Sequence, residues 1–281
     1  MAGIRDVTRR VYLRIRGRLP REPPLPTPKP PLPAPTSPEP PEPSPLPLAT
    51  YTGHGGNIFS IAFLPDSAHV VSGSIDGSMR VWSLTDGHEV GETIEIGSPV
   101  RAVAASEDGK LLASGGADGK ITLWDAKSHK KVVEGEERHL EGVNSLAVSC
   151  DSTRVASASD DKSVIVWSTS TGERLAGPFT GHTGGVLCVA FSPDAERLAT
   201  CDANTICIWH SRITELALPP IQTANYDSGA NSLSWTPDGN QIIAGCLNKS
   251  IQIFDALNGS RIARRKAHTE NIWSIAISHD G

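Results

Sequence analysis

The chain has 281 residues, 38% of them hydrophobic, and a formal net charge of −5 at pH 7. This balance argues against a globally basic nucleic-acid binder, and no apolar run approaches the roughly 20 residues that a membrane-spanning helix needs. The five cysteines lie in or beside apolar runs and show no Cys-x-x-Cys spacing. They favour a reducing compartment, so we expect a cytoplasmic protein, with a nuclear location as the alternative.

Residues 1–21 form a basic N-terminal tail with seven arginines and Asp6 as the single acid. A solvated tail explains this composition. The arginines would equally suit an arm that contacts phosphates or anionic lipid and tethers the protein to a nucleic acid or a membrane. Because Ile4, Val11 and Ile15 would share one side of a short helix, a mitochondrial transit peptide is a third interpretation.

Residues 22–45 form a proline-rich segment, and residues 20–47 hold fifteen of the 22 prolines. Such a segment cannot pair in a sheet, so we expect a disordered, extended linker. The motif Pro23-Pro24-Leu25-Pro26 recurs seven residues later as Pro30-Pro31-Leu32-Pro33. The stretch Pro23–Pro33 therefore resembles a ligand for WW-type domains, whose aromatic grooves accept polyproline helices. Both interpretations, linker and WW ligand, stay open.

From residue 46 onward, short apolar runs separated by polar turns predict consecutive antiparallel strands. An aspartate follows the first run of every unit at intervals of 42, 43, 43, 44 and 42 residues. These residues are Asp66, Asp108, Asp151, Asp194, Asp238 and Asp280. A period of about 40–45 residues with four strands in each unit is typical of a β-propeller.

Several residue types keep this phase together. An aromatic residue closes the third strand of each unit, and these are Trp82, Trp124, Trp167, Trp209 and Phe254. A Gly-His pair occurs at Gly53-His54 and Gly181-His182, and Trp124-Asp125 is a literal Trp-Asp pair. The units resemble WD40 repeats, in particular the arrays of fungal and bacterial signalling proteins. That resemblance implies an all-β WD40-type propeller over residues 46–281.

The strand count predicts five complete four-stranded units and the first strand of a sixth. Units three, four and five are expected near residues 143–180, 186–222 and 230–266, and units one and two precede them. Residues 46–52 should add an outer strand ahead of unit one, and residues 272–277 should begin unit six. We expect this incomplete array to be truncated and to expose Ile272, Ile275 and Ile277, because repeat arrays need capped ends.

Two units contain a complete set of polar residues at the spacing of a hydrogen-bond relay. The sets are His54-Ser72-Asp76-Trp82 and His139-Ser157-Asp161-Trp167. In WD40 repeats this set is a buried structural tetrad. Unit two has Ile96 in the histidine position. Unit four is one residue short before its turn, which leaves open whether Asp202 substitutes. Unit five has lost the set, so units two, four and five should be the softer ones.

The same residue types could suggest a Ser-His-Asp hydrolase, but the set recurs and no strained turn presents the serine. The remaining histidines lack metal-ligand spacing, and no glycine-rich phosphate motif precedes a helix. The sequence therefore predicts no catalytic residue, metal, cofactor or small-molecule substrate.

A gap of three and then two between apolar positions in each inner strand predicts a one-residue β-bulge, which would turn the next side chain toward the rim. We expect a protein or peptide partner to bind there. The anchors would be Phe59, Arg101, Leu187 and Trp273. Secondary contacts would come from Asn57, Ile75, Asn144, Asp160 and Asn231. Packing against the neighbouring unit is the alternative role for each. The resemblance implies an interaction scaffold, or the ligand-sensing half of a larger signalling protein.

Overall fold

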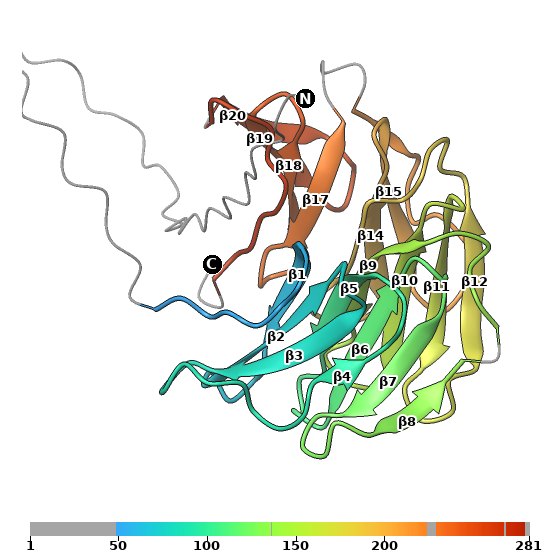
Figure 1. The fold of residues 1–281 in the computed structure, drawn as a ribbon. Helices are drawn as coiled ribbons and strands as arrows, with labels where there is room; N and C mark the ends of the chain where they lie inside the picture. Colours follow the sequence, from blue (N-terminus) through green and yellow to red (C-terminus); the bar gives the residue numbers. More distant parts are fainter. Residues whose placement is uncertain (1–48, 136, 224–228, 267, 279–281) are drawn as a thin grey trace, which may run out of the picture.

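The structure is a computed structural model that describes residues 49–135, 137–223, 229–266 and 268–278. Within these residues the chain forms five separate four-stranded antiparallel sheets, here called blades one to five in chain order (Figure 1). This confirms the expected all-β propeller architecture. The described chain has no helix long and apolar enough to cross a membrane. The predictions for the basic tail and the proline-rich segment lie outside the described residues.

Each blade follows the chain from its innermost strand outward. Blade one contains β1 (Ile58–Phe63), β2 (His69–Ser74), β3 (Ser78–Ser83) and β4 (Ile94–Glu95). Blade two contains β5 (Val100–Ala105), β6 (Leu111–Gly116), β7 (Ile121–Asp125) and β8 (Lys131–Glu134). Blade three contains β9 (Val143–Val148), β10 (Arg154–Ser159), β11 (Ser163–Ser168) and β12 (Arg174–Thr180). Blade four contains β13 (Cys188–Phe191), β14 (Arg197–Cys201), β15 (Thr205–His210) and β16 (Ile221–Gln222). Blade five contains β17 (Ala230–Trp235), β18 (Gln241–Cys246), β19 (Ser250–Asp255) and β20 (Arg261–Lys266).

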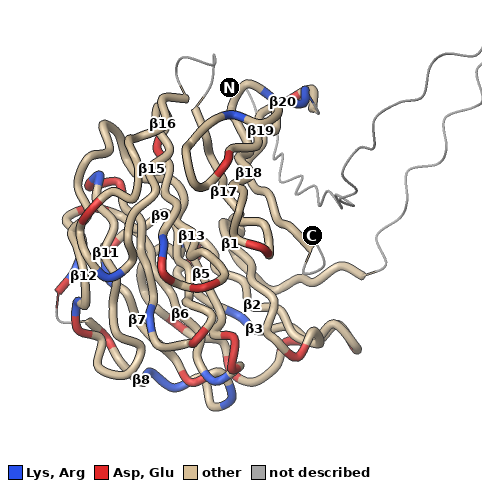
Figure 2. Tube along the Cα trace, turned by 180° about the vertical axis from the view of Figure 1, so that it is seen from behind, with Lys and Arg blue, Asp and Glu red and all other residues tan. Residues whose placement is uncertain are grey.

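The innermost strands β1, β5, β9, β13 and β17 gather at the centre of the molecule (Figure 2). β1 packs beside β5, β5 beside β9, β9 beside β13, and β13 beside β17. The hydrophobic core is accordingly divided among the seams between consecutive blades. One seam, for example, buries Val71 and Met79 of blade one against Val100 and Leu112 of blade two. Each blade therefore depends on its neighbour to bury its apolar face.

In blades one, two, three and five the predicted bulges appear as one-residue shifts in the pairing of the innermost strand. In blade four the pairing begins at Cys188 and shows no shift. In blade one, Ile58 pairs with Ser74 and Ser60 with Gly73, so Phe59 is left over and turns toward the rim. On β2, the second strand of blade one, Gly73 has no side chain, and this lets blade two approach. A Cβ atom added to Gly73 would lie 2.6 Å from Cγ1 of Val100 in blade two, closer than real Cβ contacts allow.

One hydrogen bond recurs across the seams. Its donor is a backbone N–H of an inner strand, or of the segment that follows blade five, and its acceptor is a side chain of the preceding inner strand. The acceptor atoms are Ser60 Oγ for Val103 (3.1 Å), Ser145 Oγ for Val189 (3.2 Å), Cys188 Sγ for Leu233 (3.3 Å) and Ser232 Oγ for Ile275 (3.2 Å). Blade two has Ala102 at this position, so its side chain offers no acceptor to blade three.

The segment 272–277 was expected to begin a sixth unit without a hairpin partner, and among the described residues it pairs with no strand. The predicted exposure of Ile272 is wrong, since Ile272 packs on Ile243 and Ile251 and is only 6% accessible. Ile275 and Ile277 are half-buried. Gly245 leaves room for Ile272, just as Gly73 does for Val100. The segment thus occupies the inner-strand position beside blade five without belonging to a sheet.

The predicted outer strand over 46–52 is likewise not observed in its described part, residues 49–52. Blade five already has its fourth strand in β20, and no further sheet offers this segment a partner. β17 makes no contact with β1 comparable to those between the other described inner strands. As a result Phe63 of blade one is 56% exposed. The truncated array remains a prediction.

Candidate functional site

The tetrad of blade three is a continuous buried chain of hydrogen bonds. Trp167 Nε1–H donates to Ser157 Oγ at 2.8 Å, and Ser157 Oγ lies 2.7 Å from His139 Nε2. On the other side of the ring, His139 Nδ1 lies 2.9 Å from Asp161 Oδ2. Asp161 also accepts from the Ser163 hydroxyl, and this joins the turn between β10 and β11 to the third strand. Every polar group of the set has a partner, which is the requirement for polar groups inside a core.

The charges of this tetrad follow from its surroundings. Burial lowers the pKa of His139 even though the Asp161 carboxylate opposes the shift, so the imidazole is neutral at pH 7. Burial raises the pKa of Asp161, but hydrogen bonds from Ser163, Leu140 N–H and His139 outweigh it and the net shift is downward. The aspartate is therefore ionised and the ring orients its proton toward it. A neutral histidine with both nitrogens engaged is a structural element and not an available base.

Blade one has the same geometry. His54 Nε2 lies 2.7 Å from Ser72 Oγ, which accepts from Trp82 Nε1 at 2.7 Å. His54 Nδ1 lies 3.0 Å from Asp76 Oδ2. Partial burial raises the pKa of Asp76, yet hydrogen bonds from Ser78, Gly55 N–H and His54 hold it well below its usual range. Both fully predicted tetrads are thus present as connected networks.

Blade four contains a third network that the sequence spacing left open. His182 Nε2 lies 2.7 Å from Thr200 Oγ1, and Trp209 Nε1–H donates to the same oxygen at 2.8 Å. Asp202 supplies the carboxylate 3.4 Å from His182 Nδ1, in place of the missing turn residue. Thr200 was not among the predicted residues, because it carries its hydroxyl on a threonine and not on a serine. It nevertheless follows its histidine at the same separation of 18 residues as Ser72 and Ser157.

Blades two and five have incomplete networks. In blade two, Trp124 Nε1–H still donates to Ser114 Oγ at 2.9 Å, but Ile96 fills the place of the imidazole. A small cavity remains beside Ile96, bordered by Ser114 and Asp118. In blade five, Asn248 accepts a hydrogen bond from the Ser250 hydroxyl and Phe254 replaces the tryptophan. Tyr226 of this unit lies outside the described residues.

The rim of blades two and three carries a polar network that no tetrad uses. The Arg101 guanidinium reaches across the seam and donates to Asp160 Oδ2 at 2.8 Å and to Asn144 Oδ1 at 3.1 Å. Asn144 Nδ2 in turn donates to Asp160 Oδ1 at 2.6 Å. The Arg101 and Asp160 side chains are 38% and 39% exposed. The structure therefore brings together three of the predicted contact residues, as a solvent-accessible Arg101–Asp160 ion pair joined by the Asn144 amide.

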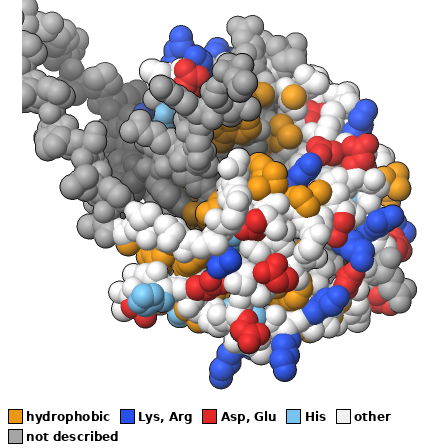
Figure 3. Space-filling view, in the orientation of Figure 1, with side chains coloured by type: hydrophobic (Ala, Val, Ile, Leu, Met, Phe, Trp, Pro, Cys, Tyr) orange, Lys and Arg blue, Asp and Glu red, His pale blue; other side chains and the backbone are white. Residues whose placement is uncertain are grey.

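The remaining predicted contact residues lie on other blades. Phe59 and Ile75 are exposed on blade one, and Trp273, on the segment after blade five, is 68% exposed. Asn231 Nδ2 donates to the Trp273 carbonyl at 3.2 Å. Asn57 is exposed, whereas Leu187 is half-buried and donates its backbone N–H to Cys201. These groups share an end of the blades but do not form one connected cluster. In the face drawn in Figure 3, hydrophobic side chains gather centrally and charges of both signs surround them.

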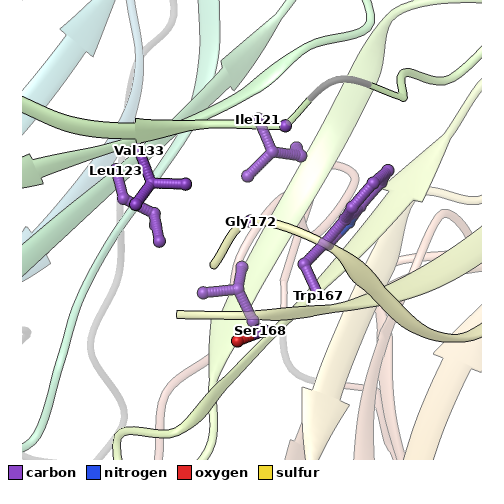
Figure 4. A pocket seen from close by; sticks show the side chains of 8 residues that line it. Ile121, Leu123, Val133, Trp167, Ser168 and Gly172 are labelled. Carbon is purple, nitrogen blue, oxygen red and sulfur yellow. The ribbon is translucent and has the colours of Figure 1, made fainter. Parts of the chain in front are cut away.

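A crevice opens in the seam between blades two and three (Figure 4). Its walls are mostly apolar and include Ile121, Val133 and the ring of Trp167. It has room for about one water molecule and lacks the convergent polar groups of a ligand site. In the described part of the chain, no three His, Cys, Asp or Glu side chains are grouped so as to hold a metal ion.

The repeated sheets, the seam cores and the recurrent His–Ser/Thr–Asp–Trp networks define a β-propeller built from sequence repeats. The family model of the WD domain with G-beta repeat, WD40, matches the chain at residues 46–83, 89–125, 131–168, 173–210 and 219–255, which is more than half of its length. The chain therefore belongs to the WD40-repeat family, as its sequence predicted.

Three curated relatives illustrate the range of proteins that share these repeats. The chain is 35% identical over 99 residues to the nuclear distribution protein nudF of Emericella nidulans and 39% identical over 84 residues to the small ribosomal subunit protein RACK1y of Oryza sativa subsp. japonica. It is 39% identical over 79 residues to the WD repeat, SAM and U-box domain-containing protein 1 of Danio rerio. The matches cover 34%, 29% and 27% of this chain but only 22%, 25% and 16% of the relatives. The chain thus spans about a quarter of their length or less.

Proposed function

We propose that this chain is a non-catalytic interaction scaffold that binds a protein or peptide on the rim defined by Phe59, Ile75, Arg101, Asp160 and Trp273. The observation that carries the proposal is the Arg101–Asp160 pair between blades two and three, which is accessible to solvent. Large apolar side chains are exposed at the same end of the blades, on blade one and on the segment after blade five. Aromatic residues and arginine contribute disproportionately to binding at protein interfaces. The tetrads are satisfied structural networks, so catalysis is not their role.

The chemistry of the rim indicates what a partner should present. An exposed ion pair contributes only about 0–1 kcal/mol to stability, so a partner carboxylate or carbonyl can displace Asp160 from Arg101 at small cost. A hydrophobic side chain of the same partner would cover Phe59 or Ile75. We also propose a cytoplasmic location, with a nuclear one as the alternative, and the support for it comes from relatives named for nuclear distribution and for the small ribosomal subunit. The WW-type interaction of Pro23–Pro33 stays a separate prediction.

The test is quantitative affinity capture with the full chain and two variants. The rim variant combines Phe59→Ala with Trp273→Ala, and the control is Leu257→Ala. Leu257 is 73% exposed in the turn between β19 and β20, at the opposite end of the blades. We expect partners retained by the wild type and the control to be lost from the rim variant while its thermal unfolding is unchanged. Equal recovery with all three proteins would refute the rim assignment.

A further inference from the structure

The seam between blades four and five differs chemically from the others. Cys188 occupies the seam-acceptor position that is serine in blades one, three and five (Ser60, Ser145 and Ser232). Directly across the ladder from it lies Cys201. In the other blades the residue that pairs with this position across the ladder is glycine or alanine, namely Gly73, Gly115, Ala158 and Gly245. Two thiols therefore replace a hydroxyl and a small residue at one seam.

The backbone holds these thiols at the separation of a disulfide. Directly opposed residues of an antiparallel pair have Cα atoms about 4.5–5.5 Å apart, within the range of about 4.4–6.8 Å that a disulfide spans. Their side chains share one face of the sheet. Cys188 Sγ accepts the Leu233 N–H of blade five at 3.3 Å and lies 3.8 Å from the Leu233 carbonyl oxygen.

The two sulfurs differ in reactivity. The hydrogen bond from Cys201 contributes most to lowering the pKa of Cys188, burial opposes it, and Leu233 N–H with the hydroxyls of Ser145 and Ser232 completes the shift to about 7. The direction of this shift favours the thiolate form at Cys188, which is the nucleophilic form of a cysteine. Burial raises the pKa of Cys201 well above its usual range, so it remains a thiol. As whole residues, Cys188 is half-buried and Cys201 fully buried, so Cys188 is the more exposed member of the pair.

We propose that Cys188 and Cys201 form a redox-active pair that takes a hydroperoxide as oxidant and closes to an intramolecular disulfide. The Cys188 thiolate attacks the terminal peroxide oxygen, the O–O bond breaks, and the leaving oxygen takes a proton to give water or an alcohol. Cys188 is now a sulfenic acid. Cys201 Sγ attacks Cys188 Sγ, the S–O bond breaks, and the departing hydroxide takes the Cys201 proton to leave as water. The peroxide gains the two electrons that the two thiols lose.

The disulfide has a structural consequence for the seam. Once bonded to Cys201, Cys188 Sγ loses the thiolate character that makes it a good acceptor for Leu233 N–H. Oxidation therefore weakens the hydrogen bond that joins the inner strands of blades four and five. The serine seams, which use an oxygen in the same place, do not respond to peroxide.

The experiment uses the full chain with Cys150→Ser, because Cys150 is exposed and would react on its own. The protein is titrated with hydrogen peroxide, alkylated without reductant and mapped by peptide mass spectrometry. Cys188→Ser and Cys201→Ala are matched variants, since other blades fold with serine and alanine in these positions. We expect a Cys188–Cys201 link in the parent, no link in Cys188→Ser, and a sulfenic acid trapped by dimedone in Cys201→Ala.

Each of three results would overturn the proposal. The first is a parent protein whose Cys188 and Cys201 both remain alkylatable after peroxide treatment. The second is a link that joins Cys201 to Cys246, and the third is a thiol loss in Cys188→Ser equal to that of the parent. Hydrogen exchange at the Leu233 amide tests the consequence for the seam. We expect faster exchange after oxidation of the parent and unchanged exchange in Cys188→Ser; equal protection in the oxidised and reduced parent would contradict the weakening.

Discussion

Replacing His139 by alanine should destabilise the propeller by about 2.5–4.5 kcal/mol. The imidazole is fully buried and engages Ser157 and Asp161, so its removal weakens two buried polar partnerships, which costs about 1–3 kcal/mol. The truncation also leaves a void of about 60 Å³, worth about 1.5 kcal/mol if it does not collapse. Ser157 keeps Trp167 as a donor and Asp161 keeps Ser163, so the loss should stay within this range.

The assay is urea unfolding followed by tryptophan fluorescence, with His210→Ala as the matched control. His210 is exposed at the end of β15, and its truncation should change the free energy of unfolding by less than about 0.5 kcal/mol. Hydrogen exchange at the Leu140 amide, which donates to Asp161, provides a local readout. A loss in His139→Ala no larger than in His210→Ala would refute the view that the tetrad stabilises blade three.

Three further predictions concern the free energy of unfolding. Burial holds the pKa of His139 below its ordinary value of 6.5, so this histidine takes up a proton in the unfolded chain before it does so in the folded chain as the pH falls below 6.5. The free energy of unfolding should therefore decrease in this range, and it should decrease less steeply in His139→Ala. Urea midpoints measured at pH 7.5 and 5.5 test this. Ile96→His should complete the network of blade two and stabilise the protein by about 1 kcal/mol in urea unfolding, a gain that Ser114→Ala in the same chain should remove. Arg154 donates across a seam to Ser211 Oγ at 2.8 Å and to the Ala195 carbonyl at 2.9 Å. Arg154→Ala should therefore lower the free energy of unfolding by about 2–4 kcal/mol. Arg212 is exposed, and Arg212→Ala should leave the urea midpoint almost unchanged.

The fold could be predicted because each repeat has its own local markers. Asp66 and its counterparts recur since the carboxylate accepts the backbone N–H two residues further on and so fixes the turn after each inner strand, as it does for Ala68. The bulge follows from the apolar spacing of one strand. These signals need no knowledge of distant contacts, and they sufficed to predict the propeller and the family.

The sequence was less informative where two blades meet. The burial of Ile272 depends on Gly245, and the role of Arg101 depends on Asp160 in the next blade. These two pairs are 27 and 59 positions apart in the sequence, and the repeat spacing alone does not say which side chains face each other. Thr200 is different, because its separation from His182 was available and only the residue type was unexpected.

The alanine at position 102 has a mechanical consequence. The joint between blades two and three lacks the side-chain acceptor found at the other joints, contains the crevice beside Trp167, and is bridged at the rim by Arg101 and Asp160. We expect it to be the most compliant joint of the described array. A ligand that binds Arg101 in place of Asp160 would therefore remove the ion pair that bridges this joint, and we expect blade three to rotate relative to blade two.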